Sequence, residues 1–195
     1  MDSRSITILD GVEKRSFTPY KYQPLQTPSA IRLIKLQSLE TASVTVNGHQ
    51  VPAYKIIDVD LDNKPTYTAL SYAWGTAPER VPFFFTGDTY LEVTASLGSA
   101  LSCLCPESST PYLWVDQLCI DQSNESERSI QVNMMARIYE QSDETLVWLG
   151  EGDQDSSLFR FGSSDFNYRF GYLVESGRPE CTFAGRNPSV LSGRS

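Results

Sequence analysis

The sequence predicts an α/β fold: a parallel sheet flanked by helices, with β-hairpins added on its N-terminal side. From residue 90 onward, apolar runs alternate with helical patterns in the order strand, helix, strand, helix, strand. In the first half, apolar runs are joined by Asn-Gly and Gly-Asp pairs, which are typical of hairpin turns. The 195 residues, 40% hydrophobic and 21% charged, suffice for one domain with a buried core.

Residues 1–30 are polar and contain three prolines, so we interpret them as an extended leader. Hairpin turns are predicted at Asn47-Gly48 and Gly87-Asp88, because both pairs tolerate positive φ angles. The strands predicted in the first half are β-compatible apolar runs bounded by turn residues: 31–36, 44–46, 51–54, 55–61, 67–72, 81–86 and 90–94.

Two helices and two strands are predicted in the second half. Ser96 is expected to cap a helix that ends before Pro106. Residues 113–120 predict a buried strand, residues 125–141 a helix, and residues 146–149 a last strand. The apolar side chains of the second helix form one face, which suits either the core or self-association: Ile130, Met134, Ile138 and Tyr139.

We expect three segments: a polar leader over residues 1–19, the domain over residues 20–161, and an irregular tail over residues 162–195. The tail is rich in Gly, Pro, Ser and Arg, which is typical of a truncated or disordered ending.

Composition excludes several function classes. The net charge of -8 disfavours a nucleic-acid partner, because such a surface must be cationic. No stretch reaches the length of a membrane span, and the N-terminus does not resemble a signal peptide, so we expect a cytoplasmic protein. His49 is the only histidine and the four cysteines have no ligand spacing, so we expect reduced thiols and no metal.

Three segments together carry a family resemblance. Residues 67–75 read Tyr-Thr-Ala-Leu-Ser-Tyr-Ala-Trp-Gly, and residues 113–122 read Leu-Trp-Val-Asp-Gln-Leu-Cys-Ile-Asp-Gln. Residues 127–150 begin Glu-Arg-Ser-Ile-Gln-Val and end Val-Trp-Leu-Gly. In this order and spacing the set resembles the heterokaryon-incompatibility (HET) domain of filamentous fungi, although Asp121 stands where that family usually has Asn.

The resemblance implies a role in fungal self/non-self recognition, in which fusion with a genetically different partner leads to programmed cell death. The HET domain is described as distantly similar to the TIR domain, which has a flavodoxin-like fold. Some TIR domains cleave NAD and others act through protein contacts, so the resemblance leaves open whether this chain is an enzyme.

Glu127 is the first candidate catalytic residue. In a TIR-like enzyme, a glutamate after a central strand would contact the ribose of NAD and stabilise the positive charge that develops as the glycosidic bond breaks. Asn124 and Glu127 also have the spacing of a capping box, which favours a structural role. Arg128 could pair with a carboxylate in either case.

Asp116 and Asp121 bracket the end of the strand predicted over residues 113–120. Ligands of open α/β sheets bind beyond the carboxyl ends of the strands, so both acids are candidates, Asp116 for catalysis and Asp121 for binding. Asp121 could equally cap the following turn. Asp116 in an apolar strand needs a hydrogen-bond donor or a shifted pKa.

Ser71, Trp74 and Gly75 end the strand predicted over residues 67–72 and are candidates for a ligand-binding wall. The Trp74 ring offers a stacking surface, and Gly75 would let a ligand approach the backbone. A packed tryptophan followed by a tight turn explains the same residues.

The sequence therefore supports three hypotheses. The first is a recognition and death module that works through protein partners or self-association. The second is an NAD glycohydrolase, with NAD as the substrate and no certain cofactor. The third is an inactive fragment of the family.

Overall fold

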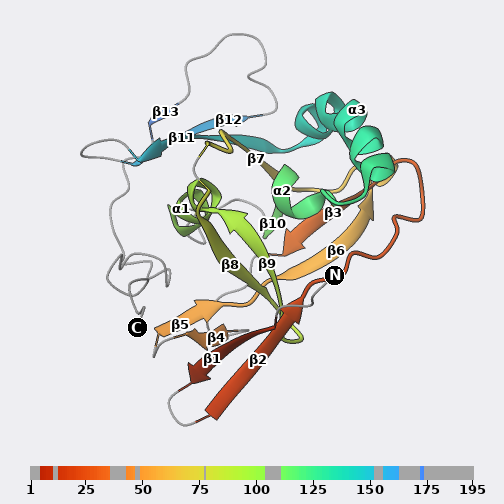
Figure 1. The fold of residues 1–195 in the computed structure, drawn as a ribbon. Helices are drawn as coiled ribbons and strands as arrows, with labels where there is room; N and C mark the ends of the chain where they lie inside the picture. Colours follow the sequence, from red (N-terminus) through yellow and green to blue (C-terminus); the bar gives the residue numbers. More distant parts are fainter. Residues whose placement is uncertain are drawn as a thin grey trace.

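The described part of the chain is dominated by β-sheet. The computed structural model describes residues 5–10, 13–35, 43–46, 49–76, 78–103, 111–151, 156–162 and 172–173. Among these residues there are three sheets and three α-helices, so the prediction of a mixed α/β fold is confirmed (Figure 1).

The largest sheet has seven strands. In spatial order they are β13 (Tyr172–Leu173), β12 (Ser156–Gly162), β11 (Glu144–Glu151), β7 (Thr68–Tyr72), β10 (Tyr112–Trp114), β3 (Ala30–Lys35) and β6 (Lys55–Asp60). Only the central trio is parallel: β7 pairs in parallel with β11 on one side and with β10 on the other.

The prediction of a parallel sheet therefore holds for three strands and needs correction for the rest. β3 and β6 pair antiparallel beyond β10, and β12 and β13 pair antiparallel beyond β11. The sheet is mixed because sequential strands β11 and β12 are joined without the helical crossover that a parallel neighbour requires. Few helices are consequently available to flank it.

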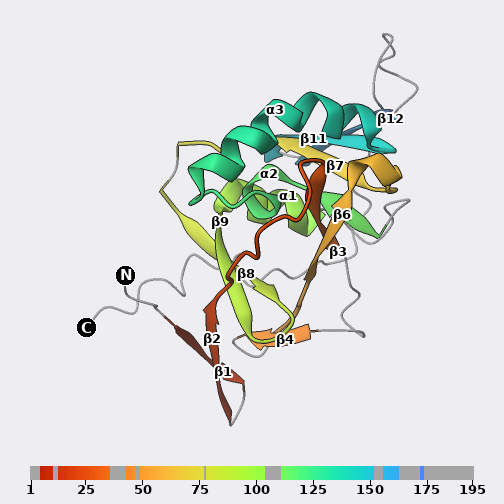
Figure 2. The ribbon, with the colours of Figure 1, turned by 90° about the vertical axis from the view of Figure 1, so that its right-hand side faces the viewer.

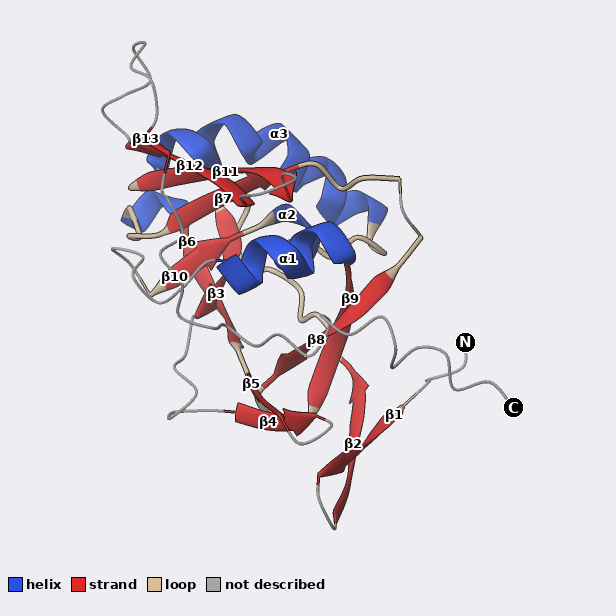
Figure 3. Cartoon of the chain, turned by 90° about the vertical axis from the view of Figure 1, so that its left-hand side faces the viewer, coloured by secondary structure: helices blue, strands red, loops and turns tan. Residues whose placement is uncertain are grey.

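Two of the three helices cover the central strands. α1 (Ala95–Cys103) buries Leu97, Ala100 and Leu101, and α3 (Glu125–Gln141) buries Ile138. Figure 3 shows α1 in front of the sheet and α3 behind it. The Tyr139 ring meets Trp114 edge-on at 5.5 Å between centroids, which fixes α3 against β10.

The strand predicted over residues 113–120 is shorter than expected. β10 stops at Trp114, and the one-turn helix α2 (Asp116–Cys119) takes the remaining residues. The prediction missed α2 because its side chains Leu118 and Cys119 are as deeply buried as those of a strand, so the run of apolar residues is continuous in both cases.

A second sheet contains, in order, β1 (Ile6–Asp10), β2 (Glu13–Pro19), β9 (Thr89–Thr94) and β8 (Arg80–Phe85). The sequence predicted the β8–β9 hairpin but no element before residue 30. β1 and β2 form a hairpin that extends away from the large sheet, at the bottom of Figure 2. Phe17 anchors it, since its ring is fully buried and contacts Phe84 at 4.9 Å between centroids.

The hairpin predicted around Asn47-Gly48 is confirmed by the antiparallel pairing of β4 (Ser43–Val46) with β5 (His49–Pro52), while the two turn residues lie outside the described residues. At the tip of β8–β9, Gly87 and Asp88 have φ angles of 84° and 56°, as that turn prediction requires. Val44 and Val51 pack with Phe17 and Phe84 in a small core of their own, separate from the main one.

The cap of α1 differs from the prediction. Thr94 Oγ1, rather than Ser96, accepts a hydrogen bond from the backbone N–H of Leu97 at 3.2 Å. Ser96 Oγ instead donates to the carbonyl of Ala73. A short 3-10 helix, η1 (Leu61–Asn63), follows β6 and is capped by Asp60.

The predicted tail lies mostly outside the described residues. Its described part is the last residue of β12, Gly162, together with β13. The boundaries at residues 19 and 161 stay predictions, since no observation tests them.

Candidate functional site

The carboxyl ends of three parallel strands meet at one edge of the large sheet. β7 ends at Tyr72, β10 ends at Trp114, and β11 continues past Trp148, which is paired with Tyr72. The carboxyl-edge cluster, as we name the polar residues gathered there, consists of Tyr72, Trp74, Thr94, Asp116 and Gln117. This edge is where open α/β sheets usually place a ligand.

Asp116 is at the centre of the carboxyl-edge cluster. Its Oδ2 accepts a hydrogen bond from the indole Nε1 of Trp74 at 2.8 Å, and its Oδ1 accepts one from the backbone N–H of Gln117 at 2.7 Å. Burial raises the pKa of the Asp116 carboxyl, and these hydrogen bonds lower it by a smaller amount. Asp116 is thus a partly buried acid beside an indole that reaches solvent.

Gln117 connects this acid to the neighbouring elements. Its Oε1 accepts hydrogen bonds from the Tyr72 hydroxyl at 3.1 Å and from the backbone N–H and hydroxyl of Thr94 at 3.1 and 3.2 Å. Since Thr94 also caps α1, one side chain on α2 fixes the positions of β7, β9 and α1.

Ser71, Trp74 and Gly75 lie at this edge as predicted. Burial raises the pKa of Tyr139 to about 12, and the nearby Ser71 side chain lowers it by a smaller amount. Trp74 is 39% exposed. Gly75 has a φ angle of 70°, and no atom lies within 4 Å of where a Cβ would stand. Backbone conformation, not crowding, is therefore what favours glycine at this position.

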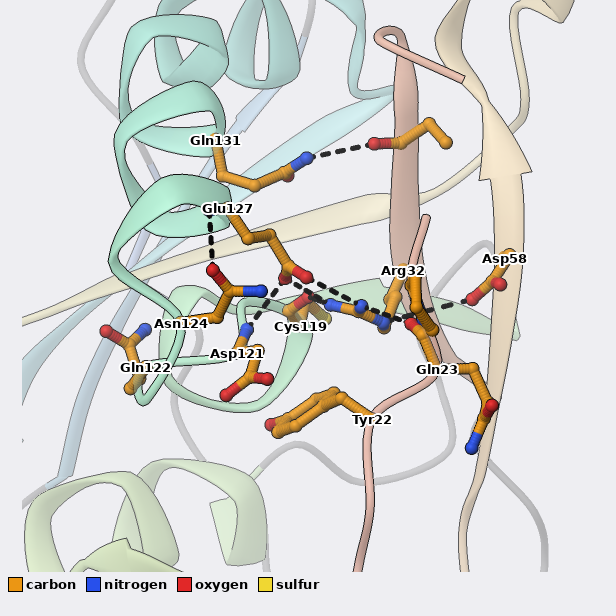
Figure 4. A network of polar contacts seen from close by, with 12 residues as sticks. Tyr22, Gln23, Arg32, Asp58, Cys119, Asp121, Gln122, Asn124, Glu127 and Gln131 are labelled. Atoms are coloured by element: carbon orange, nitrogen blue, oxygen red, sulfur yellow. Dashed lines mark hydrogen bonds and ion pairs between the residues drawn. The ribbon is translucent and has the colours of Figure 1, made fainter. Parts of the chain in front are cut away.

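Glu127 belongs to a different group of residues, which we name the Arg32–Glu127 network (Figure 4). Arg32 Nη1 lies 2.5 Å from Glu127 Oε1, and Nη2 lies 3.0 Å from Oε2, so the ion pair is bidentate. The backbone N–H of Asp121 also donates to Glu127 Oε1, at 2.9 Å. The Glu127 carboxylate therefore accepts three hydrogen bonds within the fold.

Arg32 comes from the middle of β3 and its side chain is only 1% exposed. Besides Glu127, its guanidinium donates to the carbonyls of Cys119 at 3.1 Å and Gln23 at 2.8 Å. It also lies over the Tyr22 ring, 4.7 Å from the centroid. The cation thus has a partner in α2, in α3 and in the segment before β3.

The capping prediction for α3 is confirmed in its first half. Asn124 Oδ1 accepts a hydrogen bond from the backbone N–H of Glu127 at 3.2 Å. The Glu127 side chain does not complete the reciprocal box, because it reaches back to Asp121 instead of to the Asn124 N–H.

Asp121 and Arg128 lie in the turn before α3 and at its start. Asp121 Oδ1 accepts hydrogen bonds from the backbone N–H and hydroxyl of Ser123, as in an Asx turn. Arg128 Nη1 donates to the carbonyl of Gln122 at 3.2 Å. These contacts are local to the turn, and the turn itself is joined to Asp116, because Gln122 Nε2 donates to the Asp116 carbonyl at 2.9 Å.

The predicted site residues therefore divide into two groups, one around Asp116 and one around Glu127. Sequence reasoning missed Arg32, Gln117 and Thr94. A signal existed for Arg32, since a cation within the apolar run Ile-Arg-Leu-Ile must find a buried partner. No comparable signal marked Gln117, because polar residues near a strand end are common.

Among the described residues, no three His, Cys, Asp or Glu side chains are placed to hold a metal ion. None of the helices described above combines the length and apolar character needed to cross a bilayer. Cys119 is a free, fully buried thiol, and burial raises its pKa to about 12, which leaves it protonated and unreactive at neutral pH.

Comparisons with known proteins agree with the motifs. The profile of the family described as "Heterokaryon incompatibility protein (HET)" matches residues 67–176. "Heterokaryon incompatibility protein 6, OR allele" of Neurospora crassa is 32% identical over 160 residues, which cover 76% of this chain and 23% of that protein. The chain thus spans about a quarter of this relative's length. No solved structure matches. The chain belongs to the heterokaryon incompatibility (HET) family.

Proposed function

We propose that this protein acts in fungal heterokaryon incompatibility as a cytoplasmic recognition and death module that works through protein contacts. Two facts support a role in incompatibility: the family membership and the name of the relative from Neurospora crassa. The role in cell death and the reliance on protein contacts belong to the proposal.

The observation that carries the proposal is the pair of exposed apolar side chains at the carboxyl edge. Trp74 follows β7 and is 39% exposed, and Leu149 near the end of β11 is 65% exposed. The register pairs Tyr72 with Trp148, so the two exposed side chains follow adjacent strands at the same edge. Tryptophan is enriched among the residues that dominate binding energy at protein interfaces.

The hydrogen bonds that the Glu127 carboxylate accepts favour a function through protein contacts over a catalytic one. A catalytic carboxylate must be available to the substrate, whereas both oxygens of Glu127 accept hydrogen bonds from Arg32 and one also binds the Asp121 N–H. Glu127 therefore serves the fold in this arrangement.

Expression of the chain and its variants in a filamentous fungus tests the proposal. Leu149→Asp should abolish toxicity and self-association, because it puts a charge into the contact surface without touching Asp116. Val132→Asp is the matched control, since Val132 is exposed on α3 outside this edge. Equal loss of toxicity in both folded variants, or no loss in either, would contradict a contact surface at Trp74 and Leu149.

A second candidate function is NAD glycohydrolysis by a TIR-like mechanism. The observation that favours it is Asp116, a partly buried acid with a raised pKa beside the exposed ring of Trp74 at the edge where α/β enzymes bind nucleotides. In this version Asp116, and not Glu127, is the acid closest to a solvent-accessible aromatic surface.

NAD consumption by the purified full chain separates the two candidates. The native chain is compared with Asp116→Asn and Glu127→Gln after circular dichroism has established that each variant is folded. Consumption that is lost in folded Asp116→Asn supports the enzyme. Absence of NAD consumption by the native chain, together with toxicity in the fungus, rejects the enzyme and leaves protein contacts.

A further inference from the structure

We infer that the Arg32–Glu127 pair positions the carboxyl-edge cluster. It holds the C-terminal end of α2 and thereby keeps the Asp116 carboxylate hydrogen-bonded to the Trp74 indole. The inference concerns the geometry of the site and is independent of which candidate function is correct.

The helix α2 is very short. It has four residues, with Asp116 at its first position and Cys119 at its last. One helical turn is unstable by itself, because nucleation fixes several backbone angles for a single hydrogen bond. Contacts from outside the helix must therefore hold α2 in place.

The C-terminal end of α2 receives these contacts from the Arg32–Glu127 network. The Leu118 carbonyl accepts a hydrogen bond from the Tyr22 hydroxyl at 2.9 Å, and the Cys119 carbonyl accepts one from Arg32 at 3.1 Å. Glu127 accepts the backbone N–H of Asp121, two residues beyond the helix. These contacts use two carbonyls of the last turn that the helix itself leaves free.

The N-terminal end of α2 carries two residues of the carboxyl-edge cluster. Asp116 binds the Trp74 indole, and Gln117 binds Tyr72 and Thr94. Because the backbone bonds from Cys119 to Val115 and from Ile120 to Asp116 make α2 a single rigid turn, a movement at one end displaces the other. The ion pair and the Trp74–Asp116 contact are thus mechanically linked.

This linkage extends the site beyond the segment that matches the family profile. Tyr22 and Arg32 precede residue 67, yet they supply the donors that hold α2. The region from the end of β2 to β3 is therefore part of what positions Asp116.

Tryptophan fluorescence provides a direct measurement. Trp114 and Trp148 are 0% and 2% exposed, so acrylamide in solution reaches Trp74 preferentially. Subtracting the signal of Trp74→Phe in each background isolates the Trp74 emission. Because the indole contacts the Asp116 carboxyl, the pH midpoint of this emission reports the Asp116 pKa, and the step should vanish in Asp116→Asn.

The test removes both charges of the pair at once, in Arg32→Met with Glu127→Met, so that no unpaired buried charge remains. If the inference is right, acrylamide quenching of Trp74 rises. The pH-dependent step in the Trp74 emission also shrinks, because the indole loses its contact with the Asp116 carboxyl. The matched control is Arg137→Met with Asp62→Met, an exposed ion pair that also involves α3 but does not contact α2; it should change neither signal.

A folded double variant with native quenching and a native pH-dependent step in the Trp74 emission would overturn the inference. If the double variant does not fold, Tyr22→Phe and Arg32→Lys decide. Tyr22→Phe removes only the hydrogen bond from the hydroxyl to the Leu118 carbonyl. Arg32→Lys keeps the charge but loses the bidentate geometry. Both should shift the Trp74 signals in the same direction, and unchanged signals in both folded variants reject the inference.

Discussion

Arg32 and Glu127 are separated by 95 residues in the sequence and form a buried, bidentate ion pair. Their side chains are 1% and 11% exposed. Removing two charges from water costs free energy that only close geometry and additional hydrogen bonds can offset. The carbonyls of Cys119 and Gln23 provide such bonds for the cation, and the Asp121 N–H provides one for the anion.

Removing only one partner of this ion pair should lower the free energy of unfolding strongly. Glu127→Ala leaves the buried Arg32 guanidinium with only the half-exposed Asp58 carboxylate, 4.0 Å from its Nε, and we expect the free energy of unfolding to fall by about 3–5 kcal/mol. Arg32→Met combined with Glu127→Met should cost much less, because no charge is left unpaired. Urea denaturation of both variants measures the difference. If the single and the double variant lose the same stability, the ion pair is not the cause.

Asp116 should make stability depend on pH in the acid range. The pKa of its carboxyl is higher in the folded chain than the ordinary 3.8, because of burial, so the folded state binds the proton more tightly than the unfolded state does. Ionisation of Asp116 therefore weakens folding. The free energy of unfolding, relative to that of Asp116→Asn, should decrease as pH rises above 3.8 and become constant above the raised pKa.

Urea denaturation of the native chain and of Asp116→Asn at a series of pH values checks this dependence. The comparison with Asp116→Asn cancels the contributions of the other acids, which titrate in both proteins. A difference that increases with pH would mean that the Asp116 pKa is lowered on folding.

The cap of α3 should contribute a modest amount. Asn124→Ala removes the acceptor of the Glu127 N–H, and we expect a loss of about 1 kcal/mol in the free energy of unfolding. Ser126→Ala, an exposed change in the first turn of the same helix, is the control. Thermal or urea denaturation measures both, and equal effects would exclude capping as the reason.

The small core under the N-terminal hairpin should be sensitive to Phe17. Its ring is fully buried against Phe84, so Phe17→Ala should cost about 3–5 kcal/mol. Hydrogen exchange should locate the change in β1, β2 and β9, because Phe17 packs in the small core and not in the main one. Uniform loss of protection across the large sheet would show that the two cores unfold as one.

Local signals predicted much of the fold. The helix at residues 125–141 and the hairpins at Asn47-Gly48 and Gly87-Asp88 were found because caps, periodicity and turn residues act over a few positions. The mixed pairing of the large sheet was not found. Strand direction beyond the parallel trio depends on which edges meet in space, and the apolar pattern of β3 or β12 does not encode that.

The candidate site was predicted in part for the same reason. Position after a strand end was enough to place Trp74 and Asp116 at the same sheet edge, where the structure shows a hydrogen bond between them, while their roles stay predictions. The partner of Glu127 could not be found from local spacing, because Arg32 lies in a distant strand. The hairpin β1–β2 was missed because its sequence is polar apart from Ile6, Ile8 and a few other side chains, of which Phe17 carries the packing.

The long separation between Arg32 and Glu127 also has a consequence for synthesis on the ribosome. At about 5–20 residues per second, the chain carrying Arg32 is translated roughly 5–20 s before Glu127, which lies 95 residues later. During that interval β3 can pair with β6, so the guanidinium meets only the half-exposed Asp58 carboxylate, 4.0 Å from its Nε, and the edge that will receive β10 is open. We expect the nascent chain to be most exposed to chaperones and to aggregation in this window, which closes when α3 is made.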